Sequence, residues 1–199
     1  RRDKRNREQD LKDQLIREAG SRVNVTALTA IDMISKREWL KGEDGILKSA
    51  DLPVANLRNA RLGEANLHGA DLAGAILQGA HLWAANLQSA DLNTANLKSA
   101  DLGLTNLQGA DLNTANLKGV SLVGSNLKGA KLAVAILQGA NLEQANLRGA
   151  VLRLAKFNEE TTLPDGTKWT PDTDMARFTD PNHPDFWQPY WSKKKDDKA

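Results

Sequence analysis

A large apolar residue falls at every fifth position from Leu52 to Phe157 without a gap, which makes 22 consecutive repeats. Two positions before each one lies a small residue, usually Ala, with Thr105, Val120 and Ser125 as the departures. A period of five fits neither the 3.6 residues of a helical turn nor the two-residue period of a strand. A strict internal repeat takes precedence over local propensity, so the pattern excludes an ordinary globular domain.

A second period of 20 residues overlies the first, because identical polar residues recur after every four repeats. This predicts a coil of four sides that turns a corner every five residues and rises roughly 4.8 Å, the spacing of paired strands, so the rod is about 26 Å long. One large and one small residue per repeat point inward. The predicted core includes Leu52, Leu57, Leu62, Leu67, Leu102, Leu107 and Phe157.

Two polar columns follow from stacking the coils. The first holds Asp51, Asp71, Asp91 and Asp111. Like charges about 4.8 Å apart repel by roughly 1 kcal/mol at surface dielectric, and a solvated ladder is favoured over a cation site. The second is an Asn ladder whose side-chain amides we expect to hydrogen-bond from coil to coil for stability. It holds Asn66, Asn86, Asn106, Asn126 and Asn146.

Two blocks, ADLNTANLKS and ADLNTANLKG, resemble the pentapeptide-repeat family, whose repeat is written A(D/N)LxX. The resemblance covers a little over half of the chain, and at this copy number the motif is very specific. It implies an all-β solenoid, a right-handed quadrilateral parallel β-helix. Leu or Phe and Ala would point into it, and the other three residues of each repeat would point outward.

The segments that flank the repeats predict a cover for each end of the solenoid, where core and unpaired backbone would otherwise be exposed. We divide the chain into a charged helical leader (1–21), an N-terminal capping helix (22–46), the repeats (47–158), a C-terminal cap (159–191) and a disordered tail (192–199). Asn24 is the expected N-cap of a helix that runs to about Leu40. The C-terminal cap would be a hairpin at TTLPDGTKW and then a non-helical wrap, which carries Trp169, Phe178, Phe186, Trp187, Tyr190 and Trp191.

The leader also resembles a subset of the family in which membrane spans precede the repeats. Residues 1–7 are rich in Arg and Lys and begin without Met, as expected of the cytoplasmic flank of a span in a longer protein. A soluble linker is the alternative interpretation. No stretch reaches the ~20 apolar residues of a span. We therefore expect a cytoplasmic protein, or one held at the cytoplasmic face of a membrane through a segment upstream of residue 1.

The chain predicts no catalytic, metal or cofactor site. It has no Cys, which excludes thiolate chemistry and Cys-ligated metals, and flat solenoid faces offer no cleft for convergent groups. His81 and Asp101 share one column in adjacent coils, where a solvated pair is favoured over a metal contact. We therefore interpret the protein as a non-enzyme.

Two functional classes remain. One is a structural scaffold that presents surface columns to a protein partner. The other is the DNA-mimicking inhibitor of type II topoisomerases known from some pentapeptide-repeat proteins, whose rod is strongly acidic. Residues 50–157 carry nine basic and seven acidic side chains, a net charge of +2. Because a phosphate mimic needs the opposite sign, the scaffold is favoured and no nucleic-acid partner is expected.

Trp83 is the one aromatic residue at an outward position of the repeats, and it predicts a surface. In stacked coils Gly103 and Val123 share its column, and Leu104 lies beside Gly103. Trp83, Leu104 and Val123 would then form an apolar patch. Either the indole lies flat over Gly103 and covers backbone, or the patch is a hot spot for a partner, as buried Trp anchors often are.

Overall fold

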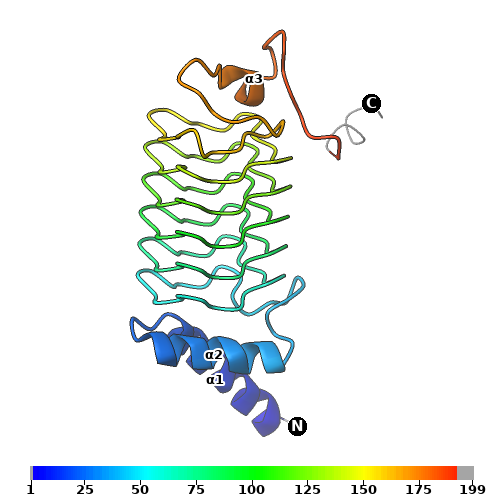
Figure 1. Cartoon of the computed structure of the whole chain (residues 1–199). Coiled ribbons are helices and arrows are strands. Elements are labelled where there is room, and N and C mark those ends of the chain that lie inside the picture. Colours follow the sequence, from blue (N-terminus) through cyan, green and yellow to red (C-terminus); the bar gives the residue numbers. More distant parts are fainter. Residues whose placement is uncertain (1, 192–199) are drawn as a thin grey trace, which may run out of the picture.

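The structure is a computed structural model that describes residues 2–191; the tail predicted for 192–199 lies outside the described residues. Three parts follow one another along the chain: α1 (Arg2–Ala19) and α2 (Asn24–Lys36) at one end, a solenoid, and a C-terminal segment with the short α3 (Ala176–Thr179) at the other end (Figure 1).

The solenoid has four columns of parallel bridges, one for each side of a 20-residue coil. The first coil pairs with the second through Asp51↔Asp71 and three further bridges at five-residue intervals. The same register continues coil by coil to residue 156. Each side of a coil is so short that it contributes a single bridge to each neighbour, and then the chain turns the next corner.

The five-residue repeat around Leu107 pairs all five of its backbone N–H groups. Asn106 N donates to the coil before, at Ala85 O (3.0 Å), and Leu107 N donates to the coil after, at Asn126 O (2.8 Å). Gly109 N also donates to the next coil, and the Thr105 amide closes the preceding turn. The fifth donor, Gln108 N, has a side-chain acceptor, the Oδ1 of Asn106 at 3.2 Å.

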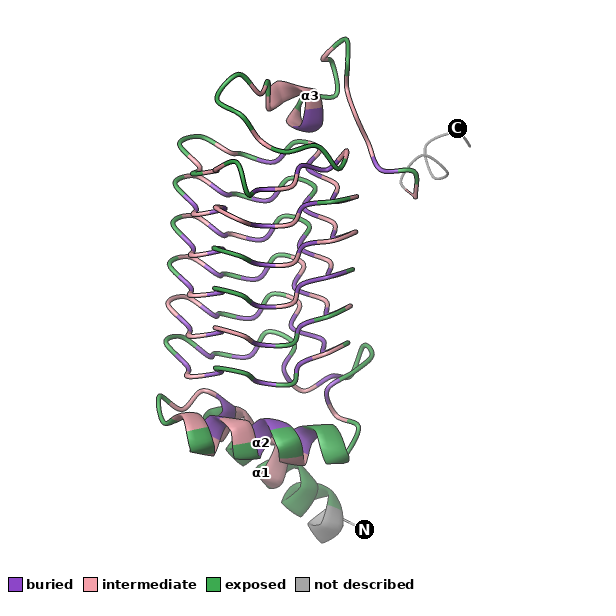
Figure 2. Ribbon diagram, viewed as in Figure 1, coloured by how far each residue is buried: buried purple, intermediate pink, exposed green. Residues whose placement is uncertain are grey.

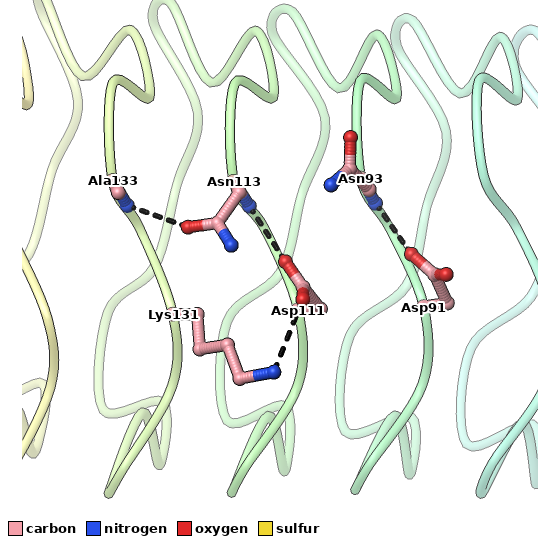
Figure 3. A network of polar contacts seen from close by, with 6 residues as sticks. All are labelled: Asp91, Asn93, Asp111, Asn113, Lys131 and Ala133. Carbon is pink, nitrogen blue, oxygen red and sulfur yellow. Dashed lines mark hydrogen bonds and ion pairs between the residues drawn. The ribbon is translucent and has the colours of Figure 1, made fainter.

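This side-chain acceptor explains why Asp or Asn precedes so many of the Leu residues. Asp91 Oδ1 accepts from Asn93 N at 2.9 Å, and Asp111 Oδ1 accepts from Asn113 N at 3.1 Å (Figure 3). These are Asx motifs, in which a short polar side chain binds the backbone two residues on. The Asp column therefore has a hydrogen-bonding role that the sequence reading did not assign to it.

One coil later the same column holds Lys131, which has no acceptor to offer. The Ala133 amide instead donates to Asn113 Oδ1 of the preceding coil at 2.9 Å, and Lys131 Nζ lies 3.3 Å from Asp111 Oδ2 (Figure 3). At this repeat the neighbouring coil therefore supplies the acceptor that the local side chain cannot supply.

The corner residue, two positions after each Leu, has positive φ throughout the repeats. From residue 49 to residue 154 every fifth residue has φ between +53° and +70°. The next amide donates back to the Leu carbonyl, as in Ala110 N to Leu107 O at 3.0 Å, which makes type II turns. Gly suits this conformation, but Val54, Leu104 and Val134 also adopt it, although it is strained for bulky and β-branched residues.

The core is the column of Leu and small residues inside the coils (Figure 2). Every repeat Leu from Leu52 to Leu147 is at most 2% exposed. Thr105 is also buried, and its hydroxyl donates to Leu82 O at 2.9 Å. The last coil differs, because Leu152 and Phe157 are only half-buried.

The leader joins the first coil through hydrogen bonds that differ from those expected. Val23, not Asn24, is the N-cap of α2, and no side-chain cap is formed. The Asn24 amide donates instead to Asn56 O of the first coil at 2.9 Å. α2 ends at Lys36 rather than near Leu40. This leaves the Leu40 carbonyl outside the helix, and it accepts from Asn66 N at 2.7 Å.

The C-terminal segment lies on the last coil (Figure 1). Thr162 pairs with Asn141 in parallel and with Lys168 in antiparallel, so a hairpin extends the solenoid by one side. The wrap expected to be non-helical contains α3. Its Phe178 is buried and packs edge-on against Trp187, with ring centroids 5.9 Å apart.

The first prediction tests the inward and outward positions. Leu107→Ala should lower the free energy of unfolding by about 2–5 kcal/mol, as for truncation of a buried Leu. Gln108→Ala, at the exposed position beside it, should change it little. Chemical denaturation of both variants checks this, and equal small losses at the two sites would contradict the assignment.

The second prediction tests the role of the Asp column. Asp91→Ala should cost about 0.5–1.5 kcal/mol, because it removes the acceptor of the Asn93 amide. Asp91→Asn keeps that acceptor and removes a like charge beside Asp71 and Asp111, so its stability should equal or exceed that of the wild type. Thermal melts at low and high salt separate the two effects. A loss in Asp91→Asn as large as in Asp91→Ala would show that the charge is what matters.

Candidate binding surface

Trp83 lies at the second residue of its turn and projects from the rod, with 47% of its surface exposed. Its ring is held against the next coil: a Cβ added to Gly103 would lie 3.3 Å from Trp83 Cδ1. Gly103 itself is buried. The indole thus lies against Gly103 of the next coil and leaves about half of its surface exposed.

Leu104 and Val123 flank the column of Trp83. Leu104 is 55% exposed and leans toward the following coil, where a Cβ on Gly124 would lie 2.8 Å from Leu104 Cδ2. Val123 is half-buried. Trp83 and Leu104 each lie against a Gly of the next coil, Gly103 and Gly124, which provides the room for the side chain. We call Trp83, Leu104 and Val123 the Trp83 face.

The Asn column combines two kinds of hydrogen bond. Each of its five residues accepts a backbone N–H two positions on, at 3.1–3.3 Å. Coil-to-coil amide bonds join Asn106 to Asn86 at 3.4 Å and Asn126 to Asn106 at 3.3 Å. At the N-terminal end Asn66 is buried and donates to Gly42 O at 2.7 Å. The coil-to-coil bonds thus join three of the five residues, Asn86, Asn106 and Asn126, into a structural ladder.

The remaining polar residues do not assemble into a reactive centre. Within residues 2–191 no three His, Cys, Asp or Glu side chains lie close enough to hold a metal ion. His81 and Asp101 occupy adjacent coils of one column, and His183 Nε2 lies 3.0 Å from Asp174 Oδ2 at the rim of the C-terminal segment. No helix in the described part of the chain is both long and apolar enough to cross a bilayer.

A cavity of about 270 Å³ lies between α2 and the first coil, where sequence reasoning placed no site. Its lining residues are Leu28, Ile31, Asp32, Ser35, Asn59 and Arg61. The period of the repeats predicted the coil edge, and the segment before the repeats predicted a helix over it. The gap between them depends on where α2 crosses that edge, and no local sequence signal reports this.

Comparison with known proteins gives one family. The family described as pentapeptide repeats matches eight copies in this chain, at residues 47–79, 65–103, 75–113, 95–133 and 135–159. Together these spans cover more than half of the chain. No curated protein matches.

Several solved structures are similar to parts of the chain. One is the pentapeptide repeat protein Rfr23 from the cyanobacterium Cyanothece 51142, with 38% identity over 47% of this chain and 63% of that one, at a TM-score of 0.47. Another comes from the Arabidopsis thaliana thylakoid lumen, with 28% identity over 57% and 77% of the two chains and a TM-score of 0.49. A third is QnrB1, a plasmid-mediated fluoroquinolone resistance protein, with 17% identity over 61% and 78% and a TM-score of 0.36.

The family match falls on the same residues as the bridged coils of the structure, and those coils repeat every 20 residues. The matched spans begin four residues before the first bridged residue, Asp51, and end three residues after Lys156. The chain therefore belongs to the pentapeptide-repeat family, and its fold is the right-handed β-helix solenoid of that family.

Proposed function

We propose that the chain is a non-enzymatic scaffold that binds a protein partner through the Trp83 face. The observation that supports this is an indole that is 47% exposed and yet held against the Gly103 backbone. Exposed aromatic side chains on an otherwise polar surface are typical of interaction sites, and Trp is enriched among the residues that dominate binding energy.

The solenoid beneath this face favours binding at low entropic cost. The Leu104 amide donates to Val123 O at 2.8 Å, and the Ala84 amide donates to Gly103 O at 2.9 Å. The backbone that carries the face is thus fixed by bonds between coils before any partner arrives. A pre-organised surface loses less conformational freedom on association.

The test is a double variant, Trp83→Ala with Leu104→Ser, used as bait beside the wild type. Bait of the full-length protein is offered to separated membrane and soluble fractions, and capture and melting temperature are both measured. We expect a partner captured by the wild type to be lost while the variant stays folded. The matched control is Leu154→Ser, which changes an exposed Leu with the same positive φ in the last coil. Reduced stability with retained capture would leave the indole only its covering role.

The DNA-mimicking class remains less favoured, because the rod carries a net charge of +2 and a phosphate mimic needs negative charge along its length. We expect no inhibition of supercoiling by a type II topoisomerase, even with the protein in large excess over the enzyme. Inhibition in that assay would favour the DNA-mimicking function again.

We further propose that both flanking segments close the solenoid. At the far end Gln144 N donates to Pro164 O at 2.8 Å, and Trp191 Nε1 donates to Gln144 O at 3.1 Å. Deletion of residues 159–191 should therefore promote association through the bared edge, which sedimentation would detect. A deleted form that stays monomeric with unchanged melting would refute the cap.

A membrane tether at the cytoplasmic face is the related proposal for the leader. It is motivated by the Arg and Lys residues of positions 1–7. Fractionation of the full-length protein tests it, and recovery only in the soluble fraction after gentle lysis would rule it out.

A further inference from the structure

The first coil has four sides, and the leader pairs two of them by hydrogen bonds. On one side Asn56 N donates to Ser21 O at 2.9 Å, and the Asn24 amide donates to Asn56 O at 2.9 Å. On another, Asn66 N donates to Leu40 O at 2.7 Å. Ser21 lies before α2 and Leu40 lies after it, so on both sides residues outside the body of the helix supply acceptors.

The other two sides differ. Among the described residues neither the N–H nor the C=O of Asp51 makes a hydrogen bond, and the same holds for Arg61, whose side borders α2. In the next coil the equivalent His81 N donates to Ala60 O at 2.9 Å, and His81 O accepts from Leu62 N at 2.8 Å. α2 passes below this side, and the interior of a helix uses its own N–H and C=O groups. The helix covers the apolar core there and cannot pair with the edge.

The cavity described above lies at this unpaired edge. Its floor includes Leu28 and Ile31 of α2, and its polar lining includes Ser35 and Arg61. At about 270 Å³ it is much larger than the ~30 Å³ share of a single water. It is smaller than the pockets of most drug-sized ligands, which start near 300 Å³, so an extended segment would lie in it only in part.

Two charged side chains line the cavity, Asp32 and Arg61. Asp32 is already paired with Lys36, with its Oδ2 at 2.6 Å from Nζ. Arg61 is exposed and has no ion-pair partner among the described residues. An occupant would therefore meet one unpaired guanidinium beside one unpaired strand edge.

We propose that the Arg61 edge is a docking site for an extended, acidic peptide segment of a partner protein, which adds one parallel strand below the first coil. A carbonyl of the segment would accept from the Arg61 N–H, the amide two residues further on would donate to the Arg61 carbonyl, and the carboxylate between them would face the guanidinium. Strand addition to an exposed edge draws its affinity from these main-chain bonds. The site is separate from the Trp83 face, so either one can fail without the other.

The experiment uses the ¹⁵N-labelled full chain and a defined probe, the acetylated and amidated peptide Ala-Asp-Leu-Asn-Thr, which copies residues 90–94. Titration should shift the Arg61 amide resonance in a saturable manner and slow its hydrogen exchange. Three further probes separate the contributions. Ala-Asp-Pro-Asn-Thr lacks the amide that would donate to Arg61, Ala-Lys-Leu-Asn-Thr reverses the charge, and succinate offers carboxylates without a backbone.

Variants of the protein complete the test. Arg61→Gln should weaken binding of the acidic peptide roughly fivefold, the upper value of an exposed ion pair, while Arg153→Gln at the far end should leave it unchanged. Ser35→Trp should fill the cavity and abolish binding, with the melting temperature confirming that it folds. No shift with the acidic peptide would overturn the proposal. So would equal shifts with the proline peptide or succinate, because both lack the strand-pairing amide.

Discussion

The structure depends on how a five-residue corner satisfies its backbone. In an extended strand, neighbours on both sides supply partners for every amide, but a chain that turns after each Leu directs one N–H per repeat along the rod surface. The side chain of Asp or Asn, two positions earlier, accepts that N–H, as Asn106 does for Gln108 at 3.2 Å. An unpaired amide costs roughly 1–3 kcal/mol where it is buried. The Asx acceptor therefore lets many short sides stack without accumulating unpaired donors.

The same requirement explains which parts of the molecule the sequence could predict. The inward Leu and Ala follow from the period, because only one pair of positions per repeat can face the axis. Positive φ at Val54 and Leu104 could not be read from composition, since these residues disfavour it. The conformation is imposed by the stacked coil: Val54 N donates to Ala73 O at 2.8 Å and Leu104 N to Val123 O at 2.8 Å. Tertiary pairing overrides local preference at both sites.

The ends were predicted less well than the middle. That some segment covers the first coil followed from its exposed core, and two helices do pack there. Asn24, however, has two competing uses, as a helix cap or as a donor to the coil edge. The edge prevails, with Asn24 Nδ2 at 2.9 Å from Asn56 O, because a carbonyl left at the end of the solenoid gains more from a partner than a solvated helix terminus does. At the far end Leu154 is 68% exposed, so the aromatic segment covers part of the coil, not all of it.

These observations separate two ways of closing a solenoid. Residues in irregular conformation, such as Ser21 and Leu40, have carbonyls to spare and continue the hydrogen bonds of the coil. A helix buries Leu core equally well, yet it offers no free backbone along its flank. A cap that is mostly helix must therefore leave at least one coil side covered and unpaired, and here the sides at Asp51 and Arg61 are unpaired. The same geometry that seals the apolar core thus preserves an edge with strand-pairing capacity, beside a helix that blocks open-ended stacking of further coils.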